Sequence, residues 1–195
     1  MTTYIPSITI PDFILSRPAA AVLLPLALGN VVGAATRPDR TQKQYMALKQ
    51  PPFNPPAWVF APVWTALYAG MGYASYRAWK AGNSSFLGTQ TFDLAKYEAS
   101  RLGSTLYTIQ LGLNLIWMPL FFGFQRPIEA TVDIVALLGT TGYLTYVWSG
   151  VDEVASYIMY PYLAWLGFAT YLSAGCGYLN GWDFKKTKAT QPKQT

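Results

Sequence analysis

Two side-chain amides lie on one face of a predicted helix in the middle of the chain. Gln110 and Asn114 are about one turn apart, and with Tyr107 and Trp117 they recur at steps of three and four residues. The sequence around them is apolar, and an amide that faces hydrocarbon is costly. We therefore expect Gln110 and Asn114 to point into the protein and to bond to other helices or to a ligand, and we favour bonding between helices.

Two carboxyl groups lie near the start of the next apolar segment. Glu129 and Asp133 are about one turn apart, a spacing that can serve general acid and base chemistry. However, no His, Lys or Arg inside the apolar segments completes a catalytic group with them. Glu129 can reach a membrane interface, whereas Asp133 lies deeper and needs a partner or a helix N-terminus. The pattern favours a structural role for Asp133 and indicates no catalytic residue.

Metal and disulfide chemistry have little support in this chain. It contains one cysteine, Cys176, and no histidine. An internal disulfide is therefore excluded, and the commonest ligand of zinc and of haem iron is missing. We expect no metal site and no covalently bound cofactor.

Large aromatic side chains recur along the segment that follows Pro55-Pro56. At helical spacing one face carries Phe60, Trp64, Leu67, Tyr68 and Met71. The last apolar segment repeats the pattern, because Trp165, Ala169 and Leu172 share a face there. Taken alone, these stripes are typical of ordinary aromatic packing and of a membrane-interface belt.

The elements that position these residues are predicted to be membrane helices. Hydrophobic residues make up 52% of the 195-residue chain and charged residues only 12%, about half the charge of a soluble domain. Since roughly 20 apolar residues span a bilayer as a helix, the uncharged blocks predict an all-α membrane protein, a bundle of five transmembrane helices. We place the spans at about 19–36, 57–79, 103–122, 128–149 and 154–180, within a domain 18–182 that follows an N-terminal extension 1–17 and precedes a basic disordered tail 183–195.

Charge and small residues bear on topology and partners. The Lys and Arg residues sit at the ends of the apolar blocks and in the tail without forming a basic face, so the net charge of +5 does not indicate a nucleic-acid partner. When these Lys and Arg residues are sorted by the side of the membrane on which each would lie, their distribution favours a cytoplasmic C-terminus. Residues 36–56 form a polar loop long enough to cap one mouth of the bundle. The pair Gly29 and Gly33 favours close packing inside the bundle over dimerisation.

At this point the sequence resembles a known family. Four features, taken in order, are similar to the signature segments of the tryptophan-rich sensory protein and translocator protein family (TspO/MBR), also called the peripheral benzodiazepine receptor family. They are the segment PPFNPPAWVFAPVWTALYAGMGY, the segment QLGLNLIWMPLFFG, the deep Asp133 and the segment YPYLAWLGFATYLS. The resemblance implies five transmembrane helices and a long first loop over an internal pocket for porphyrins and synthetic aromatic drugs. It places around that pocket Phe60, Trp64, Tyr68, Asn114, Trp117, Trp165, Ala169 and Leu172, with Tyr45 and Pro56 near its lid.

The resemblance also sets the expected function. We expect an integral membrane receptor or carrier that binds tetrapyrroles such as protoporphyrin or haem and links their level to stress or metabolic regulation. A porphyrin-degrading photo-oxidative enzyme and a sterol or lipid translocator remain alternatives, and a homodimer stays open. In a eukaryote, the resemblance implies the mitochondrial outer membrane or an endomembrane.

Overall fold

The structure, a computed structural model, describes residues 8–36, 41, 43, 46–84 and 93–184. All regular secondary structure in these residues is helical, which confirms the predicted all-α fold. The elements are α1 (Asp12–Leu15), α2 (Pro18–Ala35), the 3-10 turn η1 (Ala57–Val59), α4 (Phe60–Gly82), α5 (Leu94–Met118), the π-helical turn η2 (Pro119–Gly123), α6 (Pro127–Ser149) and α7 (Glu153–Leu179).

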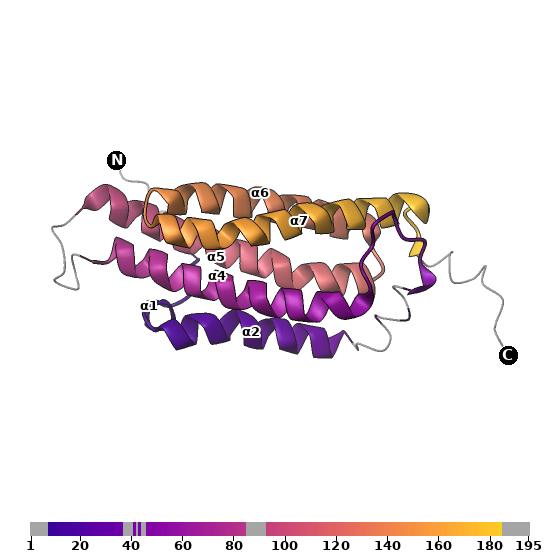
Figure 1. The fold of residues 1–195 in the computed structure, drawn as a ribbon, viewed down its shortest axis with the longest axis horizontal. Coiled ribbons are helices and arrows are strands. Elements are labelled where there is room, and N and C mark those ends of the chain that lie inside the picture. The colour runs from indigo at the N-terminus through magenta and orange to yellow at the C-terminus, as the bar shows by residue number, and fades with distance from the viewer. Residues whose placement is uncertain (1–7, 37–40, 42, 44–45, 85–92, 185–195) are drawn as a thin grey trace.

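Five long helices, α2, α4, α5, α6 and α7, run up and down beside one another (Figure 1). We call the end where α4 begins and α7 ends the first-loop end, and the other the opposite end. The predicted bundle of five helices is thus confirmed. By length and composition, three segments of the described chain can cross a membrane: Pro18–Ala35, Leu94–Gly123 and Pro127–Ser149. Helices α4 and α7 are comparably long, with 23 and 27 residues, but their tyrosine, tryptophan and small polar residues lower the mean hydropathy.

The helix bounds follow from local sequence signals. Proline occupies the first position of α2 and α6, where its missing N–H is not needed. Helix α5 begins at Leu94, well before the predicted start at residue 103, because the Asp93 side chain caps it by accepting a hydrogen bond from the Lys96 N–H at 3.1 Å. Its first turns, which carry Glu98 and Arg101, extend beyond the apolar block from which the span was predicted.

Close helix packing depends on glycine at a few positions. A Cβ atom on Gly29 of α2 would overlap the Tyr68 ring of α4, and one on Gly72 of α4 would overlap the backbone of α2 at Ala21. At Gly33, in contrast, the described residues leave open space. Gly29 therefore serves packing inside the bundle, as the sequence favoured, whereas Gly33 makes no such close contact with the described residues.

The segment before α2 is part of the bundle. Within the predicted extension 1–17, Ile10 is 8% exposed and Leu15 1% exposed, and both belong to the main core cluster. The Ile10 N–H donates to Thr108 Oγ1 of α5 at 3.0 Å, and the Trp79 indole N–H of α4 donates to Asp12 Oδ1 at 3.0 Å. This segment therefore links α2 to both α4 and α5.

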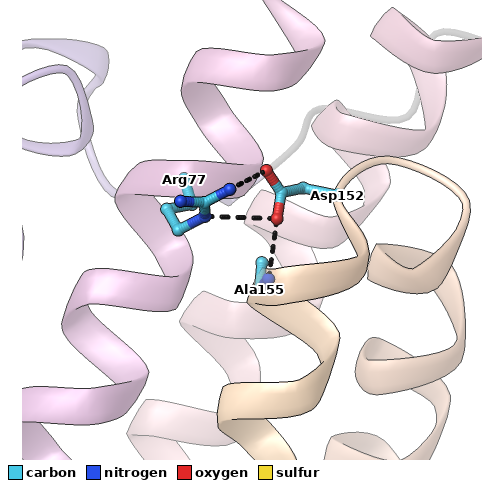
Figure 2. Close-up of polar contacts among 3 residues, drawn as sticks. All are labelled: Arg77, Asp152 and Ala155. Atoms are coloured by element: carbon cyan, nitrogen blue, oxygen red, sulfur yellow. Dashed lines mark hydrogen bonds and ion pairs between the residues drawn. The ribbon is translucent and has the colours of Figure 1, made fainter.

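At the opposite end an ion pair joins α4 to the turn between α6 and α7 (Figure 2). Arg77 Nη2 lies 2.9 Å from Asp152 Oδ2, and Arg77 Nε donates to Asp152 Oδ1 at 3.2 Å. The same Oδ1 accepts the Ala155 N–H at 2.8 Å, which caps α7. One carboxylate thus fixes both a helix start and an interhelical contact.

At the first-loop end the chain before α4 is bonded to the end of α7. The Asn180 side chain donates to the Lys49 carbonyl at 2.9 Å and accepts the Lys49 N–H at 3.1 Å. Tyr171 Oη donates to the Pro52 carbonyl at 3.1 Å. In Figure 1 this stretch of the first loop lies across the end of α7. Phe184, which belongs to the predicted tail, is 2% exposed and packs against Phe121, while 185–195 lie outside the described residues.

Candidate functional site

Aromatic rings of α4 and α7 face each other in the half of the bundle nearest the first loop. Because the two helices run in opposite directions, Phe60 meets Trp165, with ring centroids 5.9 Å apart, and Trp64 meets Tyr162 at 6.2 Å. Both contacts are edge-to-face, at 69° and 71°, a favourable geometry for aromatic pairs. Tyr68 extends the row, with its ring centroid 5.6 Å from that of Trp64. We call these five rings the aromatic ladder.

A chain of hydrogen bonds starts at the inner end of this ladder. Tyr68 Oη donates to Asn114 Oδ1 at 2.6 Å, and Asn114 Nδ2 donates to Tyr162 Oη at 2.9 Å. Tyr162 Oη donates to Gln110 Oε1 at 3.0 Å, and Gln110 Nε2 donates to Met71 Sδ at 3.7 Å. The two amides thus bond to side chains of α4 and α7, which is the interhelical bonding that the sequence favoured over a ligand contact. These five residues are called the polar chain below.

Trp117 lies in a neighbouring aromatic group. Its ring stacks on Phe121 with centroids 5.0 Å apart and an interplanar angle of 22°. Phe121 belongs to a second core cluster with Ala130, Cys176 and Phe184, and Trp117 packs against both this cluster and the main core. Trp117 therefore connects the two groups, but no ring contact joins it to the ladder among the described residues.

Three buried indole N–H groups, those of Trp117, Trp148 and Trp165, lack a partner among the described residues, and two of them lie in or next to the aromatic groups described above. Trp165 Nε1 and Trp117 Nε1 are both shielded from solvent, and neither bonds to any described residue. A buried unpaired N–H costs free energy, so each of these groups is available to an acceptor that a ligand supplies. This is the observation that most directly favours a ligand site here.

The remaining predicted site residues are placed as follows. Ala169 and Leu172 of α7 are buried, each with 7% exposure, and Ala169 belongs to the main core cluster. Pro56 is exposed at the entry to η1, and Tyr45 lies outside the described residues. A surface groove of about 310 Å³ is lined by Ile128, Thr131, Val132 and Trp182; it contains none of the predicted residues and has no polar group arranged for chemistry.

The carboxyl groups of α6 form no catalytic arrangement in the described chain. Glu129 is exposed and pairs with Arg126 at 3.4 Å. One carboxylate oxygen of Asp133, Oδ2, is buried without a partner among the described residues. Those residues also contain no group of three or more metal-ligating side chains.

Sequence reasoning missed two members of this site. Tyr162 touches Trp64 and bonds to both amides, and Met71 ends the polar chain. Tyr162 precedes Trp165 by three residues, so helical spacing alone places the two side chains on one face of α7. Helix α7 continues as one helix through Pro161, which lies between Tyr160 and Tyr162.

Comparison with known proteins adds an independent line of evidence. The model of the TspO/MBR family matches residues 21–179. The chain is 44% identical over 161 residues to the Translocator protein homolog of Schizosaccharomyces pombe, covering 83% of this chain and 90% of that protein. It is 38% identical over 156 residues to the Translocator protein of Homo sapiens, covering 80% and 86%. It is 37% identical over 161 residues to the Tryptophan-rich protein TspO of Archaeoglobus fulgidus, covering 83% and 95%. With this match over most of its length, and with its bundle of apolar helices, the chain belongs to the TspO/MBR family of membrane proteins.

Proposed function

We propose that this protein binds porphyrins and related flat apolar molecules between α4 and α7, and that it acts as their receptor or carrier in the membrane. The observation that carries the proposal is the aromatic ladder with an unpartnered indole N–H beside it. Aromatic faces supply apolar contact to a flat ring system with few polar groups. The relatives' name, translocator protein, supports a carrier role, and a link to stress or tetrapyrrole regulation is part of the proposal.

The residues present fit a porphyrin in two respects. Phe60, Trp64 and Trp165 offer rings from two helices to a macrocycle. The buried N–H groups of Trp117 and Trp165 can donate to a carboxylate, which is the polar group that porphyrins carry at their rim. Binding therefore depends on the ring and its carboxylates, and no protein ligand to a central metal is required.

Titration of the purified protein with protoporphyrin, followed by quenching of tryptophan fluorescence, tests the proposal. Trp64→Ala and Trp165→Ala are each expected to weaken binding about threefold to tenfold, since aromatic pairs contribute roughly 0.5–1.5 kcal/mol beyond burial. Trp165→Phe keeps a ring but loses the N–H, and it separates the two contributions. Trp58→Ala is the matched control, because Trp58 is 74% exposed before α4 and its removal should leave the affinity unchanged.

Two results would contradict the proposal. If both alanine variants bind protoporphyrin as tightly as the wild type does, the ladder is not the site. If a sterol binds tightly and protoporphyrin does not compete with it, a sterol or lipid translocator becomes the better description.

A further inference from the structure

Four exposed tyrosines lie on the outer face of the bundle near its opposite end. They form one ring pair on each of two neighbouring helices. Tyr143 and Tyr146 of α6 have ring centroids 6.5 Å apart, and Tyr157 and Tyr160 of α7 have ring centroids 5.7 Å apart. Each of the four is more than half exposed, so none of them belongs to the aromatic ladder inside the bundle. We call these four residues the tyrosine patch.

Hydrogen bonds between α6 and α7 set how the two ring pairs align. Ser156 Oγ of α7 donates to the Thr145 carbonyl of α6 at 3.0 Å. Farther along the same two helices, Thr131 Oγ1 and Ser173 Oγ lie 3.1 Å apart. The helices are antiparallel neighbours joined by a short turn (Figure 1), so a step toward the turn on α6 matches a step toward the turn on α7. The two helices thus keep one alignment from the turn to the first-loop end.

This alignment places the two ring pairs beside each other. Tyr146 of α6 is level with Tyr157 of α7 to within one helical turn, and Tyr143 is level with Tyr160 in the same way. The axes of packed helices lie about 8–10 Å apart, and all four side chains are on the exposed faces of their helices. The pairs therefore flank the line along which α6 and α7 meet, and a small group seated on this line can contact rings from both helices.

A carboxylate extends the patch toward the end of the bundle. Glu153, in the first turn of α7, is exposed and has no ion-pair partner among the described residues. It precedes Tyr157 by four residues, so it lies on the same face of α7, one turn closer to the helix end. The neighbouring Asp152 is paired with Arg77 at 2.9 Å. Of these two acids, Glu153 is therefore the one whose negative charge is left uncompensated beside the rings.

We propose that the tyrosine patch and Glu153 bind the choline headgroup of a phosphatidylcholine molecule in the surrounding bilayer. Tyrosine rings favour the membrane–water interface, which is the depth at which lipid headgroups lie. The face of a tyrosine ring attracts a cation within about 6 Å of its centroid, and proteins recognise quaternary ammonium groups in this way. The Glu153 carboxylate adds an opposite charge on the water side of the rings, where the choline of a lipid projects.

The same features disfavour other common headgroups. An anionic headgroup would lie beside the Glu153 carboxylate, and like charges repel each other. A primary ammonium group, as in phosphatidylethanolamine, is compact and strongly hydrated, so contact with the rings compensates less well for the water that it loses. The tyrosine patch is on the outer surface and the aromatic ladder is inside, so this inference does not depend on the proposed function.

Native mass spectrometry of the purified, delipidated protein tests the proposal, because it resolves each bound lipid. The protein is kept in a detergent without a choline group. The probes are phosphatidylcholine and phosphatidylethanolamine with identical acyl chains, which differ only in the methyl groups on the nitrogen. Phosphatidylcholine should bind first, with a dissociation constant about twofold to fivefold lower, the range expected for an exposed cation–π contact. Equal dissociation constants for the two lipids would overturn the proposal.

Variants of the rings test where the lipid binds. Tyr146→Leu and Tyr157→Leu each keep an apolar side chain toward the lipid but remove an aromatic face, so the preference for phosphatidylcholine should fall toward one. Tyr178→Leu is the matched control, because Tyr178 is 76% exposed, close to the 74% of Tyr146, but lies at the first-loop end of α7. An unchanged preference in both patch variants would overturn the proposal. An equal loss in Tyr178→Leu would do the same, because it would assign the effect to interfacial tyrosines in general.

The carboxylate is tested separately from the rings. Glu153→Gln keeps the size of the side chain and removes its charge, so the dissociation constant of phosphatidylcholine should rise about twofold to fivefold, the effect of an attraction of roughly 1 kcal/mol or less in water. Glu98→Gln is the control, since Glu98 is an exposed carboxylate near the start of α5, at the same end of the bundle. Phosphatidylcholine binding as tight in Glu153→Gln as in the wild type would overturn the part assigned to Glu153.

Discussion

Because the chain has no histidine, haem iron could take a protein ligand only from Cys176, a methionine or a tyrosine. Cys176 is 2% exposed and lies in the second core cluster. Its sulfur accepts a weak hydrogen bond from Asn180 Nδ2 at 3.7 Å, where Asn180 also holds the Lys49 backbone. The thiol therefore has a structural environment at the end of α7.

We accordingly expect metal-free protoporphyrin to bind at least as tightly as haem. Cys176→Ala should leave both dissociation constants nearly unchanged, because the ring and not the iron provides the contacts. Absorption spectra of the two complexes, recorded with wild type and variant, check this. A haem complex with a thiolate-type spectrum that disappears in Cys176→Ala would place α7 and the site differently from the structure.

The resemblance to the family predicted part of the candidate site, but neither it nor the residue spacing predicted the contacts within the site. Trp64, Tyr68 and Asn114 were expected together, and the structure brings them into contact. The bond partners of an amide inside a bundle depend on how helices rotate against each other, which spacing along one helix does not determine. For that reason Tyr162 was missed, and the stacking of Trp117 on Phe121 was not foreseen.

At the scale of elements, the helix bounds were predictable wherever an apolar block ended at a proline or a capping residue. Four of the five long helices begin and end within three residues of the predicted spans. Helix α5 differs because charged residues continue a helix outside the apolar block. The docking of residues 8–15 on α4 and α5 left no periodic signal, since it depends on two buried side chains, Ile10 and Leu15, and on single hydrogen bonds to Thr108 and from Trp79.

The ion pair between Arg77 of α4 and Asp152, which lies in the turn between α6 and α7, provides a test of one contact between helices. Partial burial acts to raise the pKa of Asp152, but hydrogen bonds from Arg77 and from the Ala155 N–H outweigh it and hold that pKa below its ordinary value of 3.8. A carboxyl group whose pKa is lower in the folded state than in the unfolded state stabilises the fold at pH values above its unfolded-state pKa. This stabilisation is lost as the pH falls below about 4.

Asp152→Ala should lower the free energy of unfolding by about 1–2 kcal/mol, the sum of a lost helix cap and a partly exposed ion pair. Asp152→Asn keeps a capping oxygen and should cost less. Unfolding midpoints measured in detergent from pH 3 to pH 7 check this, with Asp93→Ala as the control for a cap on α5. The difference between wild type and Asp152→Asn should be constant at neutral pH and shrink in acid. A difference that grows in acid would contradict the role given to Arg77.

At the scale of the whole molecule, exposed aromatic side chains mark two levels along the bundle. Near the opposite end, α6 and α7 expose Tyr143, Tyr146, Tyr157 and Tyr160. Near the first-loop end, Trp58 and Tyr178 are each more than 70% exposed. Such rings favour the membrane–water interface, so the two levels fit the two faces of a bilayer that the helices cross.

The charges at these two levels predict the orientation of the protein in its membrane. By their place in the sequence, nine of the 14 Lys and Arg residues belong to segments at the first-loop end or to the tail, and five to segments at the opposite end. At the opposite end Arg77 is also paired with Asp152. Because positively charged segments are retained on the cytoplasmic side, the first-loop end and the C-terminus should face the cytoplasm.

A C-terminal epitope tag should then be cut by protease added to the cytoplasmic face of sealed membranes, while an N-terminal tag is protected. Replacing Lys185, Lys186 and Lys188 by Gln, with the two tags unchanged, should weaken this preference, and protection of the C-terminal tag in the wild type would show that the charge difference does not set the orientation.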